Sequence, residues 1–181
     1  MGLESPFEGR LIRLRAREPE DAPLLHAWFN DAEVTEHLSM RYPLSHEQEE
    51  RFVSGASVTG YFAANFAVVT RDDGRLIGGA ELRDVSPENR TAILGITIGD
   101  KACWDGGYGT DTMRTICRFG FEMMNLNRIE LDVFAENARA RRVYEKVGFR
   151  EEGVRRQAVY KYGRYQDVVV MGLLAGELTP E

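Results

Sequence analysis

Cysteine is scarce in this sequence, and an excess of positive charge is missing. The two cysteines, Cys103 and Cys117, lie 14 residues apart in no CxxC arrangement, which excludes a disulfide framework and a zinc ribbon. We therefore expect a reducing compartment, the cytoplasm. The net charge of −6, from 23 basic and 29 acidic residues, lacks the basic footprint of a protein that binds duplex nucleic acid. No nucleic acid partner is expected.

Long apolar runs are also missing. Residues 1–6 contain neither a basic nor an apolar segment, so no signal peptide is expected. Pro6 stands where a myristoylation motif requires Ser or Thr. The uncharged stretch 52–70 includes Ser54, Gly55, Ser57, Thr59, Gly60 and Asn65, too many polar and flexible residues for a membrane span of ~20 apolar residues. We interpret it as a helix end, a loop and a buried strand, and expect no membrane association.

Histidine is nearly as rare as cysteine. His26, His37 and His46 are separated by 11 and 9 residues, a spacing that suits no metal-binding pair on one helix. The sequence therefore predicts no metal site.

Enough apolar residues are present for one core. Hydrophobic residues make up 43% of the 181, so we expect a single domain over residues 1–181. Pro19 opens a first helix and Ser45 with Gln48 forms a capping box for a second. A third helix buries a stripe from Met113 to Met124, and a fourth ends at Gly148. Alternation and β-branched residues predict strands at 11–16, 66–70, 76–84, 91–98, 129–133, 150–160 and 168–174. This order indicates a mixed α/β fold.

A glycine-rich loop at 104–110 separates a strand from the third helix. Glycines let backbone N–H groups approach a ligand, and the helix N-terminus adds partial positive charge. The loop favours a phosphate or pyrophosphate, although a plain turn has the same composition. No Gly-Lys-Ser/Thr triplet follows, which excludes a P-loop, and Thr112 replaces the third glycine of the dinucleotide fingerprint.

Four stretches together resemble the GNAT superfamily of acyl-CoA-dependent N-acyltransferases, in its RimJ/RimL-type branch. They are residues 9–21, 104–110, 137–149 and 163–168, which span most of the chain in the family's order. The resemblance implies a single-domain GNAT-like fold with a central mixed, mostly antiparallel sheet flanked by helices. It also implies acetyl-CoA, or a related acyl-CoA, as co-substrate and a homodimer.

The resemblance also assigns residues to the co-substrate. The strand 94–98 lines the acyl and pantetheine arm, and a backbone N–H near Ile98 stabilises the carbonyl oxygen. Tyr144 is the expected acid, because a phenol with a pKa of ~10 keeps a proton to give to the leaving thiolate. A helix-surface or core tyrosine is the alternative. The expected cofactor-binding residues are Ile96, Ile98, Trp104, Gly106, Gly107, Tyr108, Gly109, Thr110, Asn137, Arg142 and Lys146.

The general base is open between several groups. The resemblance points to Glu81, while Glu36, His37 and a water relay compete with it. Residues 18–50 carry nine acids and one base, a charge of −8, whereas residues 139–164 carry +6. The basic segment suits the phosphates of coenzyme A. In the family the acidic segment walls the acceptor cleft, so Glu33, Glu36 and His37 are the expected substrate-binding residues, unless this is simply a solvated acidic face.

We therefore predict an N-acetyltransferase whose acceptor, a small-molecule amine or a protein N-terminal or lysine amine, attacks the thioester directly in a ternary complex. A cationic acceptor such as a polyamine fits the acidic segment. Neither cysteine is expected to be a nucleophile. A non-catalytic acyl-CoA-binding regulatory module is the alternative, and a dinucleotide-binding oxidoreductase is a weaker one.

Overall fold

The computed structural model describes residues 5–56 and 60–180. Seven strands form one sheet in the order β1-β2-β3-β4-β5-β7-β6. Their bounds are β1 Ile12–Arg15, β2 Ala64–Thr70, β3 Leu76–Ser86, β4 Thr91–Ile98, β5 Arg128–Phe134, β6 Arg150–Lys161 and β7 Arg164–Leu174. The helices are α1 Ala22–Phe29, α2 Ala32–Thr35, α3 His46–Ala56, α4 Tyr108–Glu122 and α5 Ala138–Val147.

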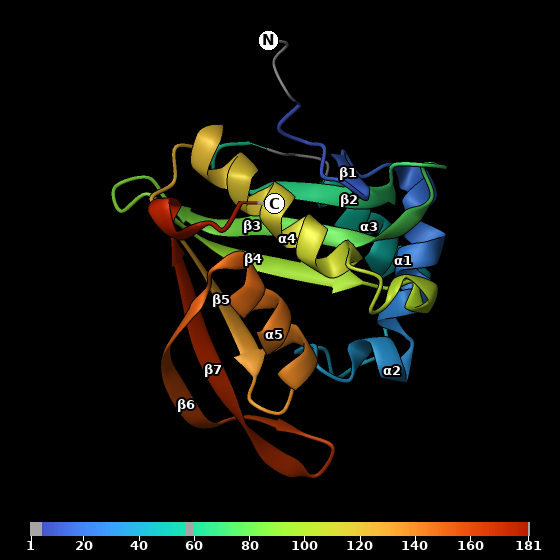
Figure 1. Ribbon diagram of the computed structural model, residues 1–181. Helices are drawn as coiled ribbons and strands as arrows, with labels where there is room; N and C mark the ends of the chain where they lie inside the picture. The colour runs from blue at the N-terminus through green and yellow to red at the C-terminus, as the bar shows by residue number, and fades with distance from the viewer. Residues whose placement is uncertain (1–4, 57–59, 181) are drawn as a thin grey trace.

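The sheet consists of two antiparallel blocks joined by one parallel contact. Among the strands that the structure describes, only β4 and β5 pair in parallel, and they do so over Thr91–Ile93. Beyond Ile93 the two strands diverge (Figure 1), and β4 continues to pair with β3 up to Ile98. One edge of residues 94–98 therefore faces a notch in the sheet. The predicted mixed, mostly antiparallel sheet is confirmed.

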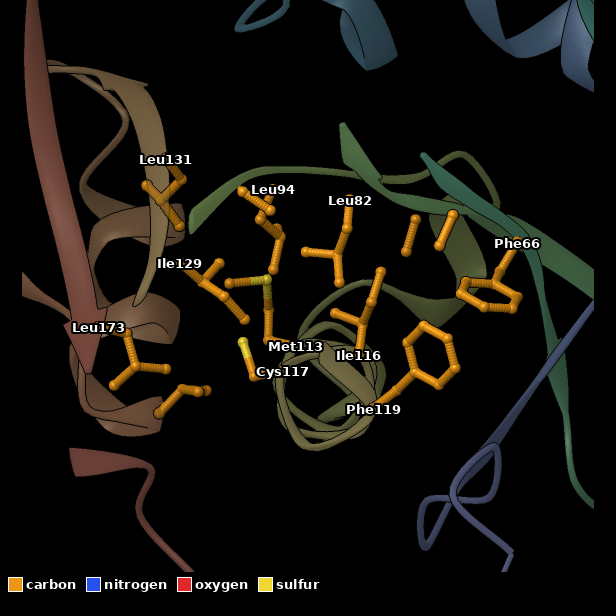
Figure 2. Close-up of a cluster of buried hydrophobic side chains, with 14 of the residues drawn as sticks. Phe66, Leu82, Leu94, Met113, Ile116, Cys117, Phe119, Ile129, Leu131 and Leu173 are labelled. Atoms are coloured by element: carbon orange, nitrogen blue, oxygen red, sulfur yellow. The ribbon is translucent and has the colours of Figure 1, made fainter. Parts of the chain in front are cut away.

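Helix α4 packs across one face of the sheet and forms the main core with it (Figure 2). The predicted stripe on this helix is confirmed, since Met113, Ile116 and Cys117 are fully buried. The opposite face carries α1 and α3, whose contact is built around Leu25 and Val53. Helix α5 lies beside β5 and β7, and the β6–β7 hairpin extends past it (Figure 1).

Several helix ends are set by local side-chain and backbone interactions. Ser45 and Gln48 form the predicted reciprocal capping box, with bonds of 2.8 and 3.2 Å. Asn137 accepts a hydrogen bond from the N–H of Ala140 at 3.0 Å and so caps α5. Gly148 ends that helix in the left-handed conformation, with φ 115°.

Three element predictions were wrong in detail. The short helix α2 was not expected, and β7 begins at Arg164 instead of 168. Helix α4 begins at Tyr108, inside the predicted loop, because Gly107 already supplies the left-handed turn that starts it. None of the described helices is long and apolar enough to cross a membrane. The predicted loop within 52–70 includes 57–59, which lie outside the described residues.

Candidate active site

A cavity of about 220 Å³ opens beside the N-terminus of α4. The end of β4, the glycine loop and one side of α5 surround it. Seven of the expected cofactor-binding residues line it: Ile98, Trp104, Gly107, Gly109, Thr110, Arg142 and Lys146. The structure thus brings together residues from three separate segments. Cys103, Asp105, Arg139 and Val143 complete the lining and were not among the expected site residues.

The loop is shaped for an anionic group. Gly107 is the N-cap of α4 and has φ 88°, a left-handed conformation that favours glycine. The helix behind it has 15 residues, so its free N–H groups and dipole present positive charge to the cavity. Arg142 and Lys146 add two cations from α5. This combination fits a phosphate or pyrophosphate.

Trp104 fastens the loop to the end of β4. Its indole N–H donates to the carbonyl of Ile98 at 2.8 Å. The guanidinium of Arg139 lies over the ring, 4.5 Å from its centroid, and its Nε lies 3.4 Å from Asp105. Arg139, which the sequence offered only as part of a basic segment, therefore joins α5 to the loop.

The remaining expected cofactor residues lie around the cavity without lining it. Gly106 precedes the N-cap, and Tyr108 and Ile96 pack partly buried against the main core. Ile96 belongs to the part of β4 that no longer pairs with β5. The side-chain oxygen of Asn137 caps α5.

Tyr144, on α5, packs against the main core, and its ring centroid lies 6.2 Å from that of Phe149. Burial raises the pKa of Tyr144 to about 12, because a phenolate loses solvation there. The hydroxyl therefore stays protonated throughout the neutral range. A group in this state can act as a proton donor and cannot act as a base near pH 7.

Glu81 lies on β3, on the opposite face from the core residue Leu82. Its carboxylate occupies the space above Gly95 of β4, where a Cβ would lie only 2.9 Å from Oε1. Arg83 Nε is 3.4 Å from the same oxygen. Since Gly95 is just past the last β4 residue that pairs with β5, the carboxylate lies where the notch begins.

The candidate acid and base thus occupy opposite faces of the sheet. Tyr144 is on the side of the main core, and Glu81 is on the side of α1 and α3. Between these two faces, β4 and β5 are no longer paired beyond Ile93. This arrangement suits a reaction in which one reactant arrives from one face and the leaving group departs on the other.

The predicted acceptor residues lie on and after α2. Glu33 accepts from Lys101 Nζ at 2.6 Å, and Asp31 lies 2.8 Å from the same nitrogen. Glu36 is exposed, with His37 Nε2 at 3.9 Å from its carboxylate. The His37 ring packs edge-on against Phe134, where β5 ends.

Cations from outside the acidic segment partly neutralise it. Arg15 pairs with Asp21 at 2.7 Å and Arg51 pairs with Glu47 at 2.6 Å. Lys101 pairs with Asp31, the N-cap of α2, and with Glu33 inside that helix. The charge of −8 counted along the sequence therefore overstates the field that a ligand would meet.

A larger cavity, about 410 Å³, lies between α2 and the β6–β7 hairpin. Its lining is aromatic and cationic, and includes Tyr42, Tyr160, Tyr162, Arg41 and Lys161. Lys161 is buried and donates to the carbonyls at 35, 36 and 38, at 2.5, 3.2 and 2.8 Å. No sequence signal marked this lysine. Within residues 5–56 and 60–180, no group of His, Cys, Asp or Glu side chains could hold a metal ion.

Comparison with known sequences gives a family. The family described as "Acetyltransferase (GNAT) domain" matches residues 11–150. An uncharacterized N-acetyltransferase, p20 of Bacillus licheniformis, is 28% identical over 179 residues, covering 97% of this chain and 98% of that protein. The spermidine N(1)-acetyltransferase of Escherichia coli (strain K12) is 29% identical over 164 residues, covering 88% and 84%.

A solved structure agrees with the sequence relatives. The crystal structure of spermidine N-acetyltransferase from Vibrio cholerae, in complex with CoA and spermine, superposes with a TM-score of 0.84. It is 27% identical, and the match covers 92% of this chain and 96% of that one.

Proposed function

Since the chain belongs to the acetyltransferase (GNAT) domain family, we propose specific binding and catalytic roles for the residues of its site. The protein is an N-acetyltransferase, which transfers an acyl group from acyl-CoA to an amine, with acetyl-CoA as co-substrate. One observation carries the residue assignments: cofactor residues expected from three segments line one cavity beside the diverging strands.

In this proposal the cavity holds the pyrophosphate. Backbone N–H groups at Gly107 and Gly109, the α4 terminus, Arg142 and Lys146 supply the positive side. The free edge of residues 94–98 accepts the pantetheine arm as an added strand, Ile96 and Ile98 included. Gly106, Tyr108, Thr110 and Trp104 shape the loop, and Asn137 holds the start of α5.

The residues then act in sequence. Glu81 takes the proton that the acceptor ammonium must lose, because only a neutral amine can attack. The N–H of Ile98 donates a hydrogen bond to the oxygen of the thioester carbonyl and stabilises the negative charge that develops on it. Tyr144 gives its hydroxyl proton to the sulfur as the C–S bond breaks. The nitrogen loses its second proton as the amide forms, and a proton taken up through water restores the phenol. The alternative of a non-catalytic acyl-CoA-binding module lacks support from these relatives, which are named N-acetyltransferases.

For the acceptor, we favour a small cationic amine, such as a polyamine, over a protein amine. Two observations support this. The relatives include spermidine N-acetyltransferases, and exposed carboxylates remain on and near α2, with Glu36 beside His37. Glu33 contributes less local attraction, because Lys101 already contacts it.

The proposal also includes four assignments for the protein as a whole. The four matching stretches favour the RimJ/RimL-type branch, and residues 1–181 form one domain in this proposal. A homodimer follows from the resemblance to that branch. The cytoplasm suits a chain whose two cysteines are both buried and unpaired.

The cofactor assignment is tested with Gly109→Ala. A Cβ there would meet only Ile98, at 4.0 Å, so the fold tolerates it and helix propensity gains up to about 1 kcal/mol. The methyl group nevertheless enters the phosphate cavity. We expect acetyl-CoA Kd, measured by calorimetry, to rise about tenfold or more while Tm does not fall.

The matched control is Gly153→Ala, on β6, where a Cβ has nothing within 4 Å. Its Kd should equal that of the wild type. Unchanged Kd in Gly109→Ala, in protein shown to be folded, would contradict the placement of the pyrophosphate. Gly107 is a poorer test position, because its φ of 88° strains any substitute.

The acceptor assignment is tested with two opposite charge changes. Glu36→Gln removes a negative charge and should raise the KM for spermidine, whereas Lys101→Gln frees Asp31 and Glu33 and should lower it. Both effects should shrink at high salt, because the Debye length is ~10 Å at 0.1 M. If the two substitutions change KM in the same direction, or if the changes do not depend on salt, the acidic residues are only a solvated face and do not attract the acceptor.

A further inference from the structure

Lys161 is the last residue of β6, directly before the turn of the β6–β7 hairpin. Only 7% of its surface is exposed, although lysine is usually a surface residue. Its ammonium nitrogen donates to the backbone carbonyls of Thr35, Glu36 and Leu38, at 2.5, 3.2 and 2.8 Å. Because an ammonium group has three donors, these carbonyls account for its whole hydrogen-bonding capacity.

The three carbonyls belong to the end of α2 and the turn after it, residues 35–38, which we call the acceptor segment. Inside it, the N–H of Leu38 donates to the carbonyl of Thr35 at 3.0 Å. The segment carries Glu36 and His37, two of the proposed substrate-binding residues. Because the side chain of Glu36 is 57% exposed, its position depends on the backbone that bears it. Lys161 binds that backbone at three points.

The hairpin that carries Lys161 is itself fixed to the sheet. Its turn residues, Tyr162 and Gly163, have φ values of 53° and 75°, the pattern of a tight two-residue type I′ turn. At the other end of the hairpin, the carbonyl of Asp167 accepts a hydrogen bond of 3.0 Å from the N–H of Ala135, which follows β5. Lys161 therefore ties the acceptor segment to a hairpin whose place is set by β5.

The acceptor segment also contacts the strand that borders the notch. The ring of His37 packs edge-on against Phe134, the last residue of β5, with centroids 6.4 Å apart. Strand β5 lies on one side of the notch, since it no longer pairs with β4 beyond Ile93. A displacement of residues 35–38 would therefore move Glu36 relative to the strands of the proposed reaction site.

We propose that Lys161 is a positioning residue for the acceptor, which holds residues 35–38 where Glu36 can meet a cationic amine. The inference rests on the proposed acceptor role of Glu36. Lys161 does not touch the reacting atoms, because its donors are used by the three carbonyls. Its positive charge alone would repel a cationic acceptor. Its effect through position and its effect through charge therefore have opposite signs.

The test measures the KM for spermidine, kcat and the Kd for acetyl-CoA in Lys161→Met, which keeps an apolar side chain and removes the ammonium. If Lys161 positions the segment, the KM should rise about tenfold, because Glu36 is no longer held in place. Both kcat at saturating spermidine and the Kd should change little, since the notch and the phosphate cavity are intact. If Lys161 acted through its charge alone, the KM should fall instead.

A double-mutant cycle separates positioning from a general loss of stability. Glu36→Gln should raise the KM in the wild type but have little further effect beside Lys161→Met, because Glu36 is then already misplaced. The matched control is Arg156→Gln, which removes an exposed cation from the same strand; in that background Glu36→Gln should keep its full effect. Ile116→Ala, a destabilising change in the main core, should leave the KM for spermidine unchanged.

The outcomes that overturn the inference are distinguishable. If spermidine is not acetylated, or Glu36→Gln alone leaves its KM unchanged, the proposed acceptor role fails and the inference falls with it. If Glu36→Gln raises the KM but Lys161→Met leaves it unchanged or lowers it, or if the two effects add, only the positioning role of Lys161 fails. Lys161→Gln, which is neutral and shorter, should shift the KM in the same direction and replaces Lys161→Met if that variant does not fold.

Discussion

Replacing Asp111 by alanine should cost much of the protein's stability, because this carboxylate joins β1 to α4. It accepts three backbone hydrogen bonds, from the N–H groups of Arg10, Leu11 and Ile12, at 3.0, 2.7 and 3.0 Å. The residue itself is buried. These bonds connect segments about 100 positions apart in the chain.

The size of this loss of stability depends on which of the three freed N–H groups water can reach. Leu11 is 40% exposed and Arg10 is exposed, so their N–H groups can be rehydrated. Ile12 is fully buried, and stranding its N–H costs about 1–3 kcal/mol. With the lost bonds to the other two donors, we expect about 3–5 kcal/mol for Asp111→Ala. Asp111→Asn keeps one acceptor oxygen and should cost about half as much.

Urea unfolding followed by circular dichroism measures both values, provided that the m-value is unchanged. Glu122→Gln, an exposed acid at the other end of α4, is the matched control and should stay within about 0.5 kcal/mol of wild type. A loss below 1 kcal/mol in Asp111→Ala would show that the three bonds are dispensable and that pairing with β2 and packing are enough to hold β1.

Three further results are expected. Tyr144→Phe should lower kcat by ~10²–10⁴ while acetyl-CoA still binds. Because the pKa of Tyr144 is raised to about 12, the rate profile of the wild type should show no loss of this acid below pH 10. Ile116→Ala, at a fully buried position of the core, should cost about 2–5 kcal/mol in urea unfolding. Burial lowers the pKa of Lys161, so its contribution to stability should rise with pH between that lowered pKa and its ordinary value of about 10.4. This rise should be absent in Lys161→Met, as unfolding at several pH values would show.

Local chemistry explains which parts of the fold could be predicted from the sequence. The ends of α5 follow from Asn137 and Gly148, whose cap and left-handed turn need only near neighbours. Helix α2 could not be predicted in this way, although Asp31 caps it locally. Its end depends on Lys161, which donates to the carbonyl of Thr35 from 126 positions away in the chain.

The same distinction applies to the candidate site. The glycine loop and α5 carry recognisable motifs, so most of the cavity lining was expected. The burial of Arg17, Glu49 and Asp111 was not expected, because the sequence alone does not distinguish a buried charged residue from an exposed one. Their burial depends on contacts between segments that the sequence keeps far apart, such as Ile12 with Asp111.

The short contact between β4 and β5 has a mechanical consequence. Three positions pair across it, whereas seven pair between β5 and β7. The sheet therefore behaves as two stiff plates, β1–β4 and β5–β7, with a compliant hinge between them and helices packed across it. A molecule lodged in the notch would act as a splint, stiffening the hinge by bridging both plates. Amide hydrogen exchange along the facing edges of β4 and β5 should then slow on binding, while exchange within each plate changes little.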